Sequence, residues 1–259
     1  MHIDPKTRRW WTLLRAVAVL NIALWAALWA LSERSGWYHQ AQLTLAGIYT
    51  LICASRSFIP RVDLERTVLL DHWLSNIVIG RSSATLAEMA FTAQLSLLFV
   101  QLSSYVPWLE PAGYALLVII AVAQLTCWAG VVTGNHLWHA AEELLWSVLV
   151  VITAAAGAAL WPHAQGAASW LIGLGWLGAL SALVVMSGLD VPMYLRRWRQ
   201  SKRDQVVYRT WAEGFADALR RREVTGEWSV WRHEVWWMTP YFSFGVWLSL
   251  ALAWFEPRL

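Results

Sequence analysis

The chain has 259 residues, of which 58% are hydrophobic and only 14% are charged, and its formal net charge is +3. A soluble domain of this length normally carries about a quarter of its residues as charges, so the composition excludes an ordinary soluble fold. The sequence predicts an all-α integral membrane bundle that forms a single membrane domain over residues 1–259.

Seven apolar stretches predict seven transmembrane helices, because a helix needs about 20 apolar residues to cross the hydrocarbon core. The predicted spans are residues 13–31, 41–59, 85–106, 112–133, 138–161, 167–189 and 238–255. The second and the seventh are short for a bilayer and would have to include flanking residues. We expect the first to remain as an anchor, because no small-residue cleavage site follows its apolar stretch.

Lysine and arginine are divided unequally between the two sides of this arrangement. With the N-terminus in the cytoplasm, all but Arg34 and Arg258 of the 20 basic residues fall in cytoplasmic segments or at their edges. Cytoplasmic loops of membrane proteins carry such an excess. We therefore expect a bacterial inner (cytoplasmic) membrane protein with a cytoplasmic N-terminus and an outer C-terminus.

Two predicted cytoplasmic segments, residues 60–81 and 190–237, are long enough to fold. The first mixes charged and apolar residues and predicts a short amphipathic helix at the membrane surface. In the second, apolar residues recur at helical spacing: Val207, Trp211, Phe215 and Ala218. Its arginines suit anionic lipid, and a protein partner is the alternative. We do not expect a nucleic-acid partner, because these basic residues are already explained by the orientation of the helices in the membrane.

The chain contains 21 tryptophans, and many lie near the ends of the predicted spans. Indole combines an apolar body with one N–H donor, which suits the headgroup level of a bilayer. We expect interfacial anchoring by Trp10, Trp11, Trp37, Trp108, Trp161, Trp236, Trp237 and Trp254.

A group of ionisable residues immediately precedes the fifth predicted span. At 100° per residue, His136, His139 and Glu143 lie within an arc of roughly 60° on one helix face, and Glu142 points to the side. Two imidazoles and a carboxylate can supply three ligands to Zn²⁺ or non-haem iron and leave a position for water or substrate. The sequence therefore predicts a divalent metal site or an acid–base site here.

The third predicted span carries Glu88 at a similar depth, so Glu88 is a candidate fourth ligand or catalytic residue beside His136, His139 and Glu143. Charged or polar residues end other helices at the same level. As substrate-binding residues we select Arg56, Arg81, Asn135 and Asp190. Of these, Arg56 and Arg81 would hold an anionic group such as a phosphate by forked hydrogen bonds.

Other features of the spans are interpreted as packing. Gln94 and Gln101 suit hydrogen bonds between helices. The three glycines Gly173, Gly175 and Gly178 suit close helix packing, since no strand precedes them as nucleotide binding would require. Cys53 and Cys127 are interpreted as small apolar residues. No predicted span contains lysine, which excludes a retinal Schiff base, and none has a deep histidine that would hold haem.

The leading hypothesis is a membrane-embedded enzyme that acts on a lipid or other hydrophobic substrate at the cytoplasmic leaflet. A non-catalytic subunit or scaffold that binds a partner through tryptophan-rich and arginine-rich surfaces is the alternative, and a transporter of small solutes or ions comes third. The same charged residues would also fit an ion-paired, hydrated rim that fixes helix packing.

Overall fold

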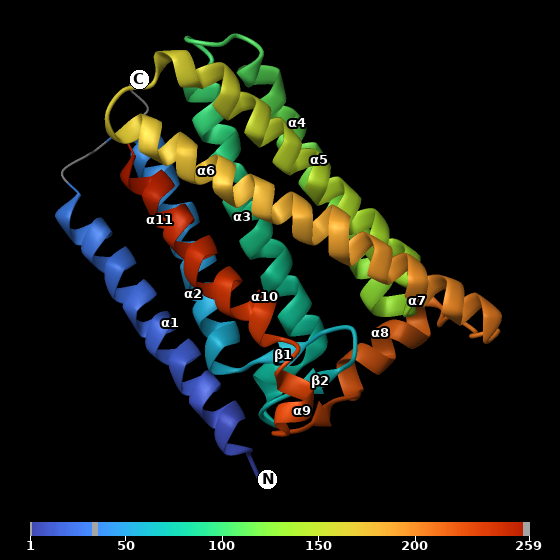
Figure 1. Ribbon diagram of the computed structural model, residues 1–259. Coiled ribbons are helices and arrows are strands. Elements are labelled where there is room, and N and C mark those ends of the chain that lie inside the picture. The colour runs from blue at the N-terminus through green and yellow to red at the C-terminus, as the bar shows by residue number, and fades with distance from the viewer. Residues whose placement is uncertain (1, 33–35, 256–259) are drawn as a thin grey trace. The chain divides into compact units, whose positions relative to one another are not determined.

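The computed structural model describes residues 2–32 and 36–255 (Figure 1). Most of the described chain is helical, which confirms the predicted all-α class. Arg34 and Arg258, the two basic residues expected outside, lie beyond the described residues. The fold separates into two compact units: residues 1–94 with 215–255 form the first unit, and residues 95–214 belong to the second.

Within the described residues, five helices are long and apolar enough to cross a membrane. They are α1 (Pro5–Leu31), α3 (Ile77–Leu102), α4 (Leu109–Thr133), the helix of α5 (His136–Leu160) with η2 (Trp161–His163), and a 37-residue helix that contains α6 (Ala167–Leu183), η3 (Val184–Asp190) and α7 (Val191–Arg203). These helices support an integral membrane protein.

Two of the seven predicted spans are not confirmed. The second lies in α2 (Trp37–Phe58), which has the length of a span but carries His39, Gln40 and Gln42 in its first turns. The seventh is divided among α10 (Val235–Pro240), the π-helix η4 (Tyr241–Gly245) and α11 (Val246–Trp254). Both segments are helical, but neither is among the five helices that are long and apolar enough to cross a membrane.

The core of the first unit lies where α1, α2 and α11 pack side by side (Figure 1). Trp10 is buried there against Trp231 of α9 (Trp228–Trp231), with ring centroids 5.7 Å apart, and its Nε1–H donates to Thr239 Oγ1 at 3.1 Å. Trp10 therefore packs inside the protein, and its predicted interfacial position stays a prediction. Trp37 and Trp236 are exposed, as membrane anchors would be.

Buried amides join the helices of the first unit. Gln94 Nε2 donates to the carbonyls of Gln42 and Ser249 at 3.2 and 3.1 Å, which confirms the interhelical role predicted for Gln94. Gln101 is exposed instead. Asn21 Nδ2 donates to the Phe242 carbonyl at 2.8 Å, inside the π-helix η4, and Asn21 Oδ1 accepts from Trp247 Nε1 at 2.9 Å.

Replacing Asn21 by alanine is expected to destabilise the protein by about 1–3 kcal/mol, because the Phe242 carbonyl and the Trp247 N–H lose their buried partner. Thermal unfolding in detergent measures the change. Thr44→Ala is the matched control, since Thr44 Oγ1 makes only a local, exposed bond to the Gln40 carbonyl. Equal unfolding temperatures for the two variants would contradict the assigned network.

Residues 60–81 do not form the predicted amphipathic helix. Strand β1 (Arg61–Val62) pairs antiparallel with β2 (Thr67–Val68), which pairs in parallel with β3 (Glu223–Val224), and the 3₁₀ turn η1 (Trp73–Ser75) follows. Arg66, at the turn between β1 and β2, has a φ of 59°. A residue in this left-handed conformation interrupts an α-helix, and the β-branched pair at β2 suits extended backbone.

The predicted segment 190–237 contains more helix than expected at its start. The membrane helix continues through α7 to Arg203 rather than ending near residue 189. Helix α8 (Trp211–Arg220) contains Trp211, Phe215 and Ala218 of the predicted pattern, and of these only Ala218 is buried. Val207 precedes the helix and is exposed.

The three glycines of α6 do not mediate close helix packing, contrary to prediction. A Cβ atom added at Gly173, Gly175 or Gly178 would have no heavy atom within 4 Å. Small side chains alone therefore did not specify a helix contact in this span.

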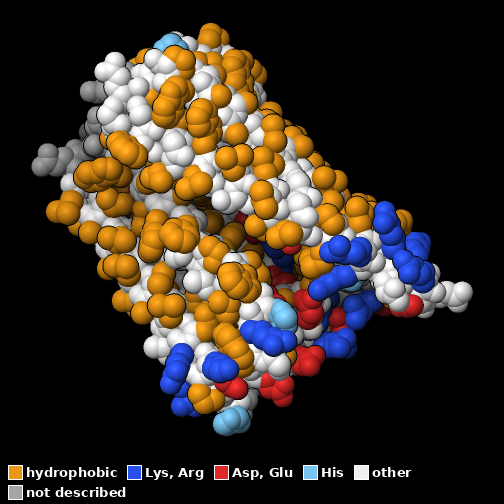
Figure 2. Space-filling view, in the orientation of Figure 1, with side chains coloured by type: hydrophobic (Ala, Val, Ile, Leu, Met, Phe, Trp, Pro, Cys, Tyr) orange, Lys and Arg blue, Asp and Glu red, His pale blue; other side chains and the backbone are white. Residues whose placement is uncertain are grey.

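Charge is segregated along the helices of each unit. Figure 2 shows hydrophobic side chains over most of the visible helical surface, while lysine, arginine and acidic side chains gather near the N-terminal end of α1 in the first unit and around α7 in the second. A band of apolar surface that ends in a charged zone is the pattern of a membrane-spanning helix bundle.

Candidate functional site

A tight turn between α4 and α5 positions the candidate site. Gly134 has a φ of +75°, a conformation that glycine adopts without strain, and its N–H donates to the Gly130 carbonyl at 2.9 Å to end α4. Asn135 then begins α5, because its Oδ1 accepts from the Leu137 N–H at 3.0 Å. The two helices consequently run antiparallel and side by side.

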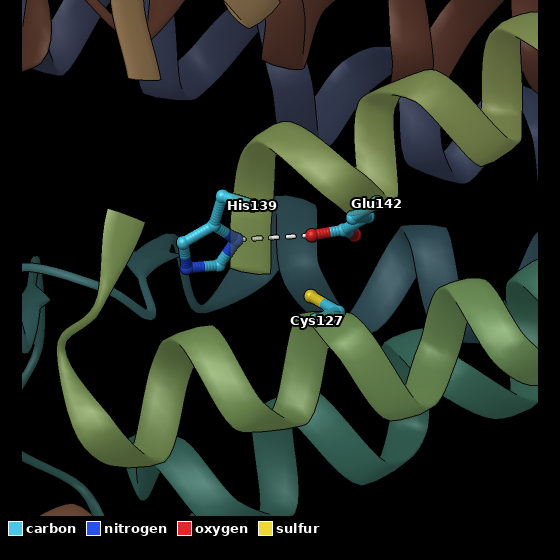
Figure 3. Close-up of side chains that lie close together, drawn as sticks. All are labelled: Cys127, His139 and Glu142. Atoms are coloured by element: carbon cyan, nitrogen blue, oxygen red, sulfur yellow. Dashed lines mark hydrogen bonds and ion pairs between the residues drawn. The ribbon is translucent and has the colours of Figure 1, made fainter. Parts of the chain in front are cut away.

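Three ionisable side chains meet between α4 and α5 (Figure 3). His139 Nδ1 lies 3.0 Å from Glu142 Oε2, one helical turn further along α5, and the Cys127 thiol approaches from α4. One potential ligand atom from each residue lies within 4.8 Å of those of the other two. The exposed fractions are 5% for His139, 7% for Glu142 and 2% for Cys127. We call these residues the Cys127–His139–Glu142 cluster.

The imidazole of His139 is held between two neighbours. A Cβ atom at Gly130 would lie 2.6 Å from His139 Nε2, so the ring occupies space that only glycine leaves open on α4. The ring of Tyr194 from α7 stacks on the other side, with centroids 5.2 Å apart. His139 Nε2 is buried and has no hydrogen-bond partner. One nitrogen of this ring thus binds a carboxylate while the other is unsatisfied.

This cluster differs from the predicted ligand set. It contains Glu142 and Cys127, and within the described part of the chain neither His136 nor Glu143 belongs to a group with metal-ligand spacing. His136 is half-buried, with its ring centroid 6.2 Å from that of Tyr194, and Glu143 is half-buried on α5. A helical wheel orders the residues of α5 alone. In the structure, Glu142 is the glutamate that lies toward α4, beside Cys127.

A signal for Cys127 was present in the sequence. Cys127 lies seven residues before Gly134, and Glu142 lies seven residues after Asn135. In an antiparallel helical hairpin, residues equally far from the turn come opposite each other. A turn at Gly134–Asn135 therefore predicts that the thiol of Cys127 lies opposite the carboxylate of Glu142.

The predicted anion-binding arginines are paired with carboxylates in the first unit. Arg81 Nη2 lies 3.1 Å from Glu88 Oε1 on α3, and both side chains are largely buried. Arg56, in the last turn of α2, lies 3.5 Å from Asp63 Oδ2. Glu88 belongs to the first unit and His139 to the second. A shared role for Glu88 and the histidines therefore stays a prediction.

A third arginine, Arg61, is buried beside the Arg56–Asp63 pair. Arg61 Nε lies 3.9 Å from Asp63 Oδ1, and Arg61 Nη1 donates to the Leu74 carbonyl at 2.6 Å. The pKa of Arg61 is lowered to about 10, mainly by burial and in part by the neighbouring Arg56, while Asp63 opposes the shift. Arg61 stays charged at neutral pH, so the two arginines share one carboxylate near the end of α2.

Two further predicted substrate-binding residues have definite places. Asn135 Oδ1 is used as the cap of α5, and Asp190 is the last, half-buried residue of η3. Their contribution to binding stays a prediction. Comparison with protein-family models, curated proteins and solved structures finds no match, so the chemistry of the side chains carries the functional argument.

Proposed function

We propose that the protein is a membrane-embedded enzyme that acts on phospholipid at the cytoplasmic leaflet, with His139 and Glu142 as its reactive groups. The buried imidazole–carboxylate pair carries the proposal. A carboxylate bound to one ring nitrogen fixes the tautomer and orientation of histidine, so that the other nitrogen can accept or deliver a proton.

The position of this pair supports a lipid substrate. His139 and Glu142 lie in the first two turns of a helix that is long and apolar enough to cross a membrane, so they are near one of its ends. Arg209 lies against the α4–α5 turn, where its N–H donates to the Thr133 carbonyl at 3.1 Å and its Nη1 is 3.5 Å from a Cβ placed at Gly134. A guanidinium at the turn suits the phosphate of a lipid headgroup.

The orientation follows the distribution of positive charge. The end of the second unit that begins α5 also carries the basic residues of α7, and such residues favour the cytoplasmic side. The reaction would therefore take place at the inner leaflet, where the substrate diffuses laterally to the helix ends.

Reconstitution into vesicles of phosphatidylethanolamine and phosphatidylglycerol tests the function, with lipid products followed by mass spectrometry. The wild-type protein is expected to form product, and His139→Gln and Glu142→Gln are each expected to lower the rate by about 100-fold or more, the usual range for loss of acid–base catalysis. Cys53→Ser in the first unit is the control. Wild-type vesicles that form no more product than empty vesicles would contradict the proposal and favour a non-catalytic subunit.

A further inference from the structure

We propose that Cys127, His139 and Glu142 together bind one Zn²⁺ ion. The proposal deepens the proposed function and rests on it for the purpose of the site, where His139 and Glu142 would act as metal ligands in place of a free acid–base pair. Metal binding is measured without any substrate. The two can therefore fail separately: a protein that binds zinc and leaves lipid unchanged would contradict the function alone.

The donor set favours zinc over other divalent ions. A thiolate is a soft ligand, which disfavours Mg²⁺, Ca²⁺ and Mn²⁺, and a neutral imidazole and a carboxylate are common zinc ligands. Three protein ligands leave the fourth tetrahedral position for water or substrate, which is the arrangement of catalytic zinc sites. A divalent cation would also compensate a thiolate and a carboxylate that are both more than nine-tenths buried.

The separations within the cluster are close to those that zinc requires. With bonds of about 2.1 Å to nitrogen and oxygen and about 2.3 Å to sulfur, tetrahedral ligand atoms stand roughly 3.4–3.6 Å apart. His139 Nδ1 and Glu142 Oε2 are 3.0 Å apart, and no pair of ligand atoms exceeds 4.8 Å. Side-chain adjustments of about an ångström would complete the site, with the ion between the nitrogen and the oxygen.

The second nitrogen of the His139 ring is buried and unsatisfied among the described residues. His139 is 95% buried, and its Nε2 has no hydrogen-bond partner. A neutral imidazole carries one proton and one lone pair, so the proton directed at Glu142 leaves the lone pair buried without a donor. A zinc ion on Nδ1 would shift the ring proton to Nε2, so the donor set and the ligand separations carry the proposal rather than this nitrogen.

The neighbouring glutamates provide the sharpest test. The purified full chain is stripped with chelator and dialysed against ZnCl₂, and zinc per chain is measured by mass spectrometry. One zinc per wild-type chain is expected, and Glu142→Gln and Cys127→Ser are each expected to weaken binding by about 100-fold, beyond the effect of most outer-shell changes. Glu143→Gln, His136→Gln and Cys53→Ser are expected to retain the metal.

Folding is followed in the same samples by circular dichroism and by elution volume, so that loss of zinc is separated from loss of structure. The proposal is overturned if the wild-type chain binds no stoichiometric zinc, or if folded Glu142→Gln and Cys127→Ser bind as the wild type does. Loss of zinc in Glu143→Gln and His136→Gln, with retention in Glu142→Gln, would overturn it in favour of the ligand set predicted from the helical wheel.

Discussion

Gly214→Ala is expected to destabilise the second unit by about 3 kcal/mol, the upper part of the range for overpacking. A Cβ atom at Gly214 would lie 2.0 Å from the Val132 carbonyl oxygen and 2.6 Å from its carbon. These are backbone atoms, so α8 cannot keep its place against the end of α4 by moving one side chain. Thermal unfolding in detergent measures the loss.

Gly175→Ala on α6 is the matched control. No heavy atom lies within 4 Å of a Cβ at Gly175, and alanine favours a helix over glycine by about 1 kcal/mol. This variant is therefore expected to unfold at the wild-type temperature or above it. If Gly214→Ala also unfolds there, the close approach of α8 to the Val132 carbonyl is wrong.

Breaking the buried Arg81–Glu88 pair is expected to have the second large effect. Glu88→Leu leaves the Arg81 guanidinium buried without the carboxylate that lies 3.1 Å away, which costs about 3–5 kcal/mol. Both side chains have exposed fractions near one-tenth, so solvent screens the pair little. The free energy of unfolding in a mild denaturing detergent measures the change.

The double variant Arg81→Met with Glu88→Leu completes a thermodynamic cycle. Replacement of both charges by apolar side chains removes the uncompensated cation, so most of the lost stability should return. Additive losses in the double variant would show that the two side chains act independently, and the buried ion pair would have to be abandoned.

The helical membrane class could be predicted from composition, and the boundary between helices α4 and α5 could be predicted from the residues of the turn between them. Asparagine is a favoured N-cap residue, and Asn135 caps α5 through its hydrogen bond with the Leu137 N–H. Such features depend on a few neighbouring residues and can be predicted from the sequence. The spans at α2 and α10–α11 were less predictable, because polar side chains, among them the buried Gln42 and Ser249, interrupt their apolar sequence.

The candidate site was predicted in part. His139 has a neighbouring carboxylate, but that carboxylate is Glu142 rather than Glu143, and the functional role of His139 stays a proposal. A helical wheel shows which residues share a face without showing which face meets another helix. The position of Cys127 depends on the register of the α4–α5 hairpin, and a thiol in an apolar stretch is usually only a packing residue.

Residues 60–81 illustrate a different limit. Their mixture of charged and apolar residues resembles an amphipathic helix, but β1 pairs with β2, and β2 pairs with β3, which lies more than 150 residues later in the chain. A pairing at this separation leaves no local periodic pattern, because each strand is only two residues long. Tertiary contact decided the conformation of this segment.

Cobalt substitution tests most directly whether the Cys127–His139–Glu142 cluster is a metal centre. Co²⁺ replaces zinc in thiolate sites and makes the metal–sulfur bond visible as a charge-transfer absorption. The wild-type chain and Cys53→Ser should both show this absorption at one cobalt per chain, and Cys127→Ser should lose it. An absorption that is absent from the wild type, or that persists in Cys127→Ser, would contradict the assignment of Cys127 as a ligand.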